Sequence, residues 1–298
     1  MYVSFLHGRN SKQLINLIKP YLKDEALRKS MLDVDSASLH FQVWWLGQSG
    51  FLIHYQGQYL LLDPYLSDSL TIKYANTDKP HIRMTELVID PSRLDFIDVV
   101  TSSHNHTDHL DGDTLIPLIQ KNPNLKMVIP EANRQFVSNR IGCEFNWPIG
   151  LNVNEKISSG HFTFYGVPAA HNDLDRNEHG QCLYMGYVIS FGPWTIYHSG
   201  DTLWYEGLDK LLSQFRIDVA FLPINGNKPE RRVAGNLNAA EAARLGKEIN
   251  ARLVIPCHYD MFTFNTEDPS TFVEAAEKIG QVCKVMQCGE RWTSSELS

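Results

Sequence analysis

The segment SSHNHTDHLDG, residues 102–112, concentrates three histidines and two aspartates within eight positions. It follows IDVVTSS, whose apolar and β-branched residues predict a buried strand, and it precedes residues 112–121, whose spacing predicts a helix. In α/β folds the loops at neighbouring strand ends converge on one edge of a sheet, and functional sites form there. The segment therefore predicts an α/β fold with a site at this strand end.

The spacing of the ligand-type residues in this segment, HxHxDH, suits metal binding. Residues two apart on an extended or tightly turning loop project to the same side, so His104 and His106 can share one cation. Asp108 and His109 can then turn toward a second cation. Imidazole and carboxylate donors bind borderline-soft divalent ions at roughly 2.0–2.2 Å. The pattern predicts that this loop contributes two ligands to each of two ions.

Three further ligand-type residues stand just after predicted strands. His171 follows FTFYGVPAA, Asp201 follows WTIYHSG, and His258 follows RLVIPC. With the loop they supply five histidines and two aspartates, enough for two divalent ions that share a carboxylate and a water. We expect the first ion to bind His104, His106 and His171, the second to bind Asp108, His109 and His258, and Asp201 to bridge the two.

The dispersed residues also have purely structural explanations. His171 could hydrogen-bond Asp173, and Asp201 could cap a helix that begins near Thr202. Asp111, the last acid of the histidine-rich segment, is left out of the ligand set and is interpreted as the cap of the helix that follows.

Two more polar residues are candidates for orienting the ligands from behind. Asp63 ends the run LLLD, where it could hydrogen-bond a ligand histidine or its loop, although an aspartate before proline is also typical of a turn. His198 lies three residues before Asp201 and could orient it, or could be a core histidine. The other histidines have no ligand pattern and are interpreted as surface or packing residues: His7, His40, His54, His81, His161 and His179.

The rest of the chain reads as one α/β domain behind a short helical extension. Residues 11–32 have helix-type spacing with a break at Pro20, so we expect a helical extension over residues 1–40. The main α/β domain is expected over residues 41–298 and begins with FQVWWLG, FLIHY and YLLLDPYL, typical of consecutive hairpins. Later strands, KMVIP, LYMGYVIS and DVAFLP among them, alternate with helices predicted at 112–121, 131–141, 238–250 and 270–280.

Charge and cysteine usage limit the cellular context and the partners. The chain has 27 basic and 34 acidic residues, a net charge of −7, which disfavours nucleic acid as a partner. Its five cysteines are odd in number and form no CxxC pair, which favours a reducing cytoplasm. Apolar runs fall short of the ~18 residues that a membrane span needs. These features predict a cytoplasmic protein without a nucleic-acid or membrane partner, and they leave the oligomeric state open.

The motifs SHNHTDHLD, AAH, SGDT and PCH occur in the order typical of the metallo-β-lactamase-fold hydrolases, and the chain resembles that family over roughly residues 41–290. The resemblance implies an αββα sandwich with a dinuclear site at one edge of two facing sheets. Within the family, WWLGQSGFLI, IDVVTSSHNHTDHLD, YHSGDT and NAAEAARLGKEINARLVIPCHYD most resemble the L-ascorbate-6-phosphate lactonase branch. A weaker likeness is to the N-acyl-phosphatidylethanolamine phospholipase D branch. The lactonase pattern does not require a histidine at position 171. The histidine found here favours a complete two-metal site.

The expected activity is metal-dependent hydrolysis by a metal-bridging hydroxide, since two divalent ions lower the pKa of a shared water toward neutrality. Zinc or manganese suits the ligands, and iron is compatible. Asp108 and Asp201 are the candidate proton shuttles to the leaving group. The chain has no GxSxG, P-loop or GxGxxG motif, which disfavours serine-hydrolase and nucleotide-driven chemistry.

The substrate must be selected by the loops beside the metal centre. Cations at Arg176, Lys228, Arg231 and Arg232 could hold an anion, or could be solvated surface charges. A small sugar-derived lactone or ester, with or without a phosphate, is the expected substrate. The alternatives are a phosphodiesterase, phospholipase D-like or RNA-processing, and a non-catalytic metal-bound binding protein.

Overall fold

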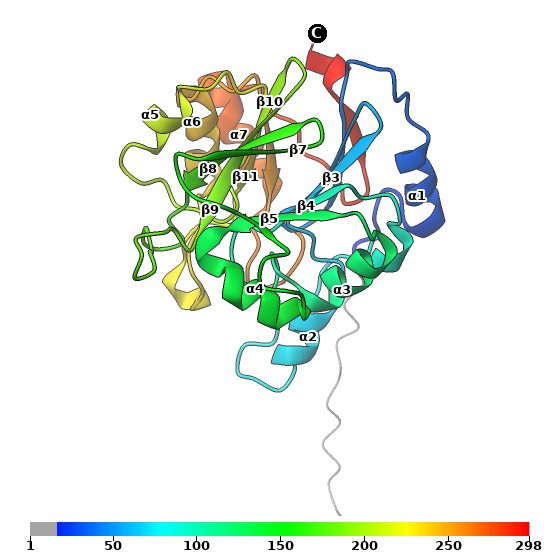
Figure 1. Ribbon diagram of the computed structural model, residues 1–298. Helices are drawn as coiled ribbons and strands as arrows, with labels where there is room; N and C mark the ends of the chain where they lie inside the picture. Colours follow the sequence, from blue (N-terminus) through cyan, green and yellow to red (C-terminus); the bar gives the residue numbers. More distant parts are fainter. Residues whose placement is uncertain (1–16, 298) are drawn as a thin grey trace, which may run out of the picture.

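Two β-sheets lie face to face, and helices cover their outer faces (Figure 1). The computed structural model describes residues 17–297. The helices α3 and α4 lie along the first sheet, and α5, α6 and α7 lie along the second. This arrangement is the predicted αββα sandwich.

The first sheet begins as an antiparallel meander and continues as parallel strands. Short turns at Gln48 and Gln56, both with positive φ, join the first three strands and make consecutive hairpins. From β3 onward the neighbours are parallel, because helices and long loops connect them. In spatial order the strands are β13 (Arg291–Thr293), β1 (Gln42–Gly47), β2 (Gly50–Tyr55), β3 (Gln58–Leu62), β4 (Val99–Thr101), β5 (Lys126–Pro130) and β6 (Ile149–Leu151).

The second sheet places the ends of three ligand-bearing strands at one edge. β8 and β10 are both antiparallel to β9, and β10, β11 and β12 are mutually parallel, so β8, β10 and β12 all run in one direction. Their carboxyl ends therefore meet at the same edge. In spatial order the strands are β12 (Leu253–Cys257), β11 (Val219–Pro223), β10 (Trp194–His198), β9 (Met185–Phe191), β8 (Phe162–Pro168) and β7 (Lys156–Ser159).

The helices agree closely with the predicted segments in the middle and at the end of the chain. They are α1 (Asp24–Leu32), α2 (Ser69–Tyr74), α3 (Gly112–Lys121), α4 (Arg134–Ile141), α5 (Leu208–Leu212), α6 (Ala239–Glu248) and α7 (Pro269–Ile279), with 3₁₀ turns at Pro91–Arg93, Glu131–Asn133, Pro229–Arg231 and Ser294–Leu297. The sequence interpretation missed α2, α5 and the short strands β6, β7 and β13, since runs of three to six residues show little periodicity.

The core lies between the sheets and is rich in aromatic residues. The ring of Phe51 in β2 lies 4.3 Å from that of Phe221 in β11, and all of Phe51 is buried. Phe41 meets Phe191 of β9 edge-to-face at 5.3 Å. Such pairs join the two sheets, because each ring comes from the opposite inner face. The core thereby fixes the relative positions of the loops at the sheet edge.

The amino-terminal prediction needs correction for the residues that the structure describes. Only Asp24–Leu32 is helical, and residues 11–16 lie outside the described range. Residues before α1 instead follow the segment 84–88, with Ile18 hydrogen-bonded to Met84 and Glu86. Pro20, which lacks an N–H donor, favours this extended conformation. Because α1 buries Leu27 and Met31 in the main core, the separation of residues 1–40 as an extension stays a prediction.

Candidate metal centre

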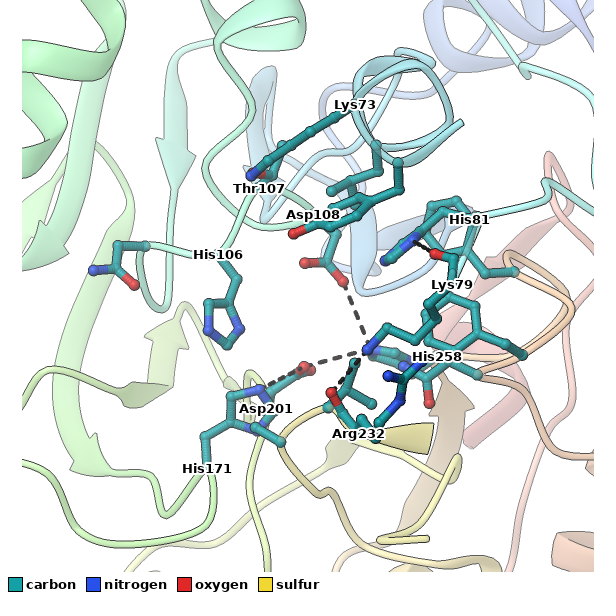
Figure 2. Close-up of a pocket in the computed structure, with 18 of the residues that line it drawn as sticks. Lys73, Lys79, His81, His106, Thr107, Asp108, His171, Asp201, Arg232 and His258 are labelled. Atoms are coloured by element: carbon teal, nitrogen blue, oxygen red, sulfur yellow. Dashed lines mark hydrogen bonds and ion pairs between the residues drawn. The ribbon is translucent and has the colours of Figure 1, made fainter. Parts of the chain in front are cut away.

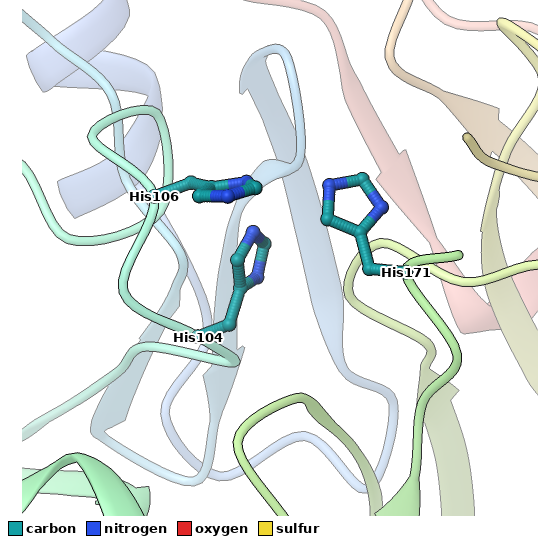
Figure 3. Close-up of side chains that lie close together, drawn as sticks. All are labelled: His104, His106 and His171. Atoms are coloured by element: carbon teal, nitrogen blue, oxygen red, sulfur yellow. The ribbon is translucent and has the colours of Figure 1, made fainter. Parts of the chain in front are cut away.

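Three histidine rings face one another at the edge of the sandwich (Figure 3). His104 and His106 come from the loop after β4, and His171 follows β8; one ring nitrogen of each lies within 4.8 Å of the others. Nδ1 of His171 donates to the carbonyl of Gly235 at 2.9 Å, which leaves Nε2 free to face the other two rings. Burial, reinforced by neighbouring histidines, lowers the pKa of His104 well below its usual range. The neutral rings therefore offer lone pairs suited to a cation.

A second group contains two carboxylates and two histidines. Asp108, His109, Asp201 and His258 also offer ligand atoms within 4.8 Å of one another. Burial alone would lower the pKa of His109, but the carboxylates of Asp201 and Asp108 raise it well above its ordinary value. Burial alone would raise the pKa of Asp201, yet the charges of His109 and His258 hold it well below its usual range. The second group therefore places two carboxylates directly beside two imidazoles.

Asp201 lies between the two groups (Figure 2). Its Oδ2 atom is 3.6 Å from Nε2 of His171 and 3.4 Å from Nε2 of His258. Its Oδ1 atom is 3.2 Å from Nε2 of His109. One carboxylate thus faces ligand atoms of both groups, as a bridging ligand must.

Several atoms of the site that could bind a cation are buried and have no hydrogen-bond partner. They are Nε2 of His104, Nε2 of His109 and Oδ1 of Asp201. Buried polar atoms are nearly always hydrogen-bonded, so unpaired atoms that converge on one place point to a ligand. Imidazole and carboxylate donors in these proportions suit zinc, manganese or iron. The residues therefore fit a pair of divalent cations.

Asp63 supports this site from beneath. Its Oδ2 atom accepts a hydrogen bond from Nδ1 of His109 at 2.8 Å, and Oδ1 accepts from the Thr101 hydroxyl at 2.8 Å and from the Ser103 amide at 3.0 Å. Burial by itself would raise the pKa of Asp63. The hydrogen bond from His109 and the neighbouring histidines outweigh this effect, so the pKa is lowered from its ordinary value. The aspartate thus touches both a candidate ligand and the backbone of the loop that carries it.

His198 and Asp111 make contacts other than those expected. Nε2 of His198 donates to the Ser49 carbonyl at 3.0 Å, so within the described part of the chain the ring holds the β1–β2 turn and is not hydrogen-bonded to Asp201. Asp111 stands at the amino-terminal cap position of α3, but its carboxylate bonds no backbone amide there. It accepts instead from the hydroxyls of Ser67, Ser69 and Thr114, at 2.6, 2.9 and 2.6 Å.

A cavity of about 470 Å³ opens above the two groups of candidate ligands (Figure 2). Its floor contains His106, Asp108, His171, Asp201 and His258. The remaining charged side chains of the wall are cationic: Lys73, Lys79, Arg140 and Arg232. Four aromatic residues also line it: Tyr74, Phe136, Phe262 and Phe264. The wall therefore combines positive charge with flat apolar surface.

Of the four cations predicted to contact substrate, Arg232 alone lines this cavity. Lys228 pairs with Glu267 at 2.8 Å, and Arg231 donates to the Thr266 carbonyl at 2.7 Å. Arg176 is exposed and donates to the Gly180 carbonyl at 2.7 Å. These three side chains do not line the cavity, and each has a partner in its own loop or in another one.

Sequence reasoning missed other residues at the site. His81, interpreted as a packing residue, lines the cavity and stacks on Tyr74 at 4.1 Å. Lys73, Lys79 and Arg140 also line the cavity, and none of them lies in a sequence motif. They come from α2, from the loop after it and from α4. Gln48 had a weak signal, its position in the turn GQSG between two strands.

Residues 42–258 match the family model of the beta-lactamase superfamily domain, and the chain belongs to this superfamily. Within it, the chain is a metal-dependent hydrolase of the metallo-β-lactamase fold. The UPF0173 metal-dependent hydrolase of Caldivirga maquilingensis is 29% identical to it over 245 residues, covering 81% of this chain and 92% of the relative.

Two solved structures share the fold. Igni18, a metallo hydrolase from Ignicoccus hospitalis, aligns with a TM-score of 0.63 and 20% identity over 85% of this chain and 98% of its own. A possible metal-dependent hydrolase from Veillonella parvula aligns with a TM-score of 0.67 and 16% identity over 84% of this chain and 98% of its own. In the described part of this chain, every helix is too short or too polar to cross a membrane.

Proposed function

We propose that this hydrolase acts on a small anionic ester at a two-metal centre, with a sugar-derived lactone, phosphorylated or not, as the foremost substrate. The observation that carries the proposal is the cavity wall. Apart from the histidines and the two candidate ligand carboxylates, all of the acidic and basic residues that line the cavity are lysine or arginine: Lys73, Lys79, Arg140 and Arg232. A substrate with a carboxylate or phosphate would complement this charge.

In this proposal His104, His106 and His171 would hold the first ion. Asp108, His109 and His258 would hold the second, and Asp201 would lie between the two. Two divalent ions at this centre would activate a water and polarise the oxygen that gains charge during attack. The chain itself must then deliver a proton to the leaving group. Asp108 suits that task better than Asp201, because its side chain is 17% exposed to the cavity and that of Asp201 is 4% exposed.

The cationic wall also suits a phosphodiester, which is the second candidate substrate class. The same activated water could attack phosphorus, and lysine and arginine bind phosphate oxygens as readily as carboxylates. The resemblance of the sequence to the lactonase branch favours the lactone. The cytoplasmic location and the absence of a nucleic-acid partner belong to this proposal as well.

The test is a substrate panel assayed on protein loaded with manganese or with zinc. The panel contains sugar lactones with and without a phosphate, carboxylate esters and phosphodiesters. We expect lactone turnover to exceed phosphodiester turnover, and anionic lactones to have lower KM values than neutral ones. A preference for phosphodiesters would overturn the choice of substrate, and tight metal binding without turnover of any ester would favour a binding protein.

A further inference from the structure

Gln48 occupies a strained and buried position beside the second group of candidate ligands. It lies in the turn between β1 and β2 with a φ of +51°, and it is 1% exposed. Its backbone carbonyl accepts hydrogen bonds from the amide of His258 at 3.0 Å and from Nε1 of Trp45 at 3.1 Å. Non-glycine residues adopt this backbone conformation rarely, and such strain collects at functional sites. The turn is thus tied directly to a candidate ligand.

The side chain of Gln48 reaches the same place as the ligand atoms. Its amide nitrogen is 2.7 Å from Oδ2 of Asp108 and 2.9 Å from Nε2 of His258. These two atoms are themselves 3.7 Å apart. The amide oxygen, Oε1, is buried without a hydrogen-bond partner. The side chain therefore bridges two candidate ligands with its donor end and leaves its acceptor unsatisfied, which is costly in a buried site.

Half a turn about the last side-chain torsion exchanges the amide nitrogen and oxygen and leaves the rest of the residue in place. This torsion has a broad, roughly two-fold profile, so the exchange requires no strained rotamer. Two ligand atoms bound to one cation at roughly 2.0–2.2 Å and at right angles lie about 3 Å apart. The present 2.7 and 2.9 Å separations are close to that spacing.

We propose that Oε1 of Gln48 is an additional ligand for the cation held by Asp108, His109 and His258. The inference rests on the proposed two-metal centre and deepens it. In this structure the amide N–H groups bridge Asp108 and His258, and the reversed amide orientation would direct Oε1 to an ion held by these residues. The unsatisfied acceptor and the close approach to two ligand atoms then have one common explanation.

The proposal makes the two metal sites chemically different. The three-histidine site offers nitrogen together with one bridging carboxylate. The second site would offer oxygens from Asp108, Asp201 and Gln48 beside its two imidazoles. Amide and carboxylate oxygens suit harder ions such as manganese, whereas imidazole suits zinc. We therefore expect the second site to lose manganese affinity more than zinc affinity when the amide oxygen is removed.

The experiment compares Gln48→Leu, which removes the oxygen, with Gln48→Glu, which keeps one. Gln42→Leu is the matched control, because Gln42 of β1 is likewise a buried glutamine but contacts His54, at 2.7 Å, outside the site. Calorimetric titration with Mn²⁺ and Zn²⁺ gives the affinity of each site, and the absorption spectrum of Co²⁺-loaded protein reports coordination number. Thermal unfolding of the metal-free proteins checks that each variant folds.

We expect Gln48→Leu to weaken manganese binding at one of the two sites roughly 10–100-fold, with stronger Co²⁺ absorption from a lower coordination number. Gln48→Glu and Gln42→Leu should keep both affinities close to those of the unaltered protein. Equal losses in the leucine and glutamate variants, or no loss in either, would overturn the role of Oε1 while the two-metal centre stands. Failure of the unaltered protein to bind two ions would remove the metal centre itself.

Discussion

The contacts of each charged side chain, more than its position in the sequence, decide whether it faces the substrate. Arg231 and Arg232 are adjacent, yet Arg231 bonds backbone carbonyls beneath its loop and Arg232 lines the cavity. Arg232 does pair with Asp78 at 2.7 Å, but both partners are more than half exposed. Exposed ion pairs contribute little free energy, so the guanidinium can exchange Asp78 for a substrate anion.

Replacing Arg232 by alanine should raise the KM for an anionic substrate roughly 10-fold or more, since a hydrogen bond to a charged group contributes about 1.5–3 kcal/mol. The value of kcat should change less, because the contact is made in the ground state and in the transition state alike. Steady-state kinetics of Arg232→Ala and of Arg176→Ala, an exposed arginine outside the cavity, provide the comparison. Equal KM values in the two variants would show that Arg232 does not bind the substrate.

Short elements form the wall of the cavity, and they depend on contacts to the long ones. Helix α2 has six residues, too few to be stable by itself. Hydroxyls just before and at its start are bonded to Asp111 at the beginning of α3. On the other side, Leu70 packs with Tyr65, Met261 and Phe262 in a cluster separate from the main core. The position of α2 is therefore set by its two neighbours.

Replacing Asp111 by alanine should lower the free energy of unfolding by about 1–3 kcal/mol, because three hydroxyls lose a shared acceptor. Two of them belong to Ser67 and Ser69, so the cavity wall should loosen as well. Urea unfolding of the metal-free protein measures the loss. Asp113→Ala, an exposed acid in the same helical turn, is the control and should change stability little. A loss of the same size in both variants would argue against the shared acceptor.

The candidate metal-binding groups join the two sheets of the molecule. His104, His106, Asp108 and His109 belong to the loop after β4 of the first sheet, and the other three follow strands of the second. The Tyr187 hydroxyl in β9 also donates to the Ser102 carbonyl of that loop, at 2.8 Å. Cations bound here would connect loops from both sheets and would favour the folded state by mass action.

Removing the metal with a chelator should therefore lower Tm. One site at a hundredfold excess of ion over Kd stabilises the fold by about 2.7 kcal/mol, which is several degrees for a chain of this size. Differential scanning calorimetry with and without chelator measures the difference. Asp201→Asn should reduce the Tm difference between metal-loaded and chelated protein. Asp218→Asn, which disturbs the pair with Arg252 at 3.0 Å, should lower Tm itself but leave that difference unchanged. An unchanged Tm after complete metal removal would contradict the proposal.

Local patterns were enough to predict most of the elements. The limits of α3 and β5 agree with the predicted ranges at both ends. The hydrophobic periodicity and the turn residues that set these limits are local to a few residues. The motif order also indicated the αββα sandwich and the seven residues that the structure gathers into two groups. Which atoms of those residues face one another depended on folding.

The cavity above those residues could be seen only in the folded chain. Lys73, Lys79 and Arg140 come from three separate segments, and their meeting depends on how α2 and α4 pack. Gln48 is 60 residues from Asp108 and 210 from His258, a separation over which no sequence pattern operates. The sequence by itself determined the strand ends and the kinds of ligand they carry. Tertiary structure decided which charges and amides surround them, because burial and long-range pairing are properties of the packed molecule.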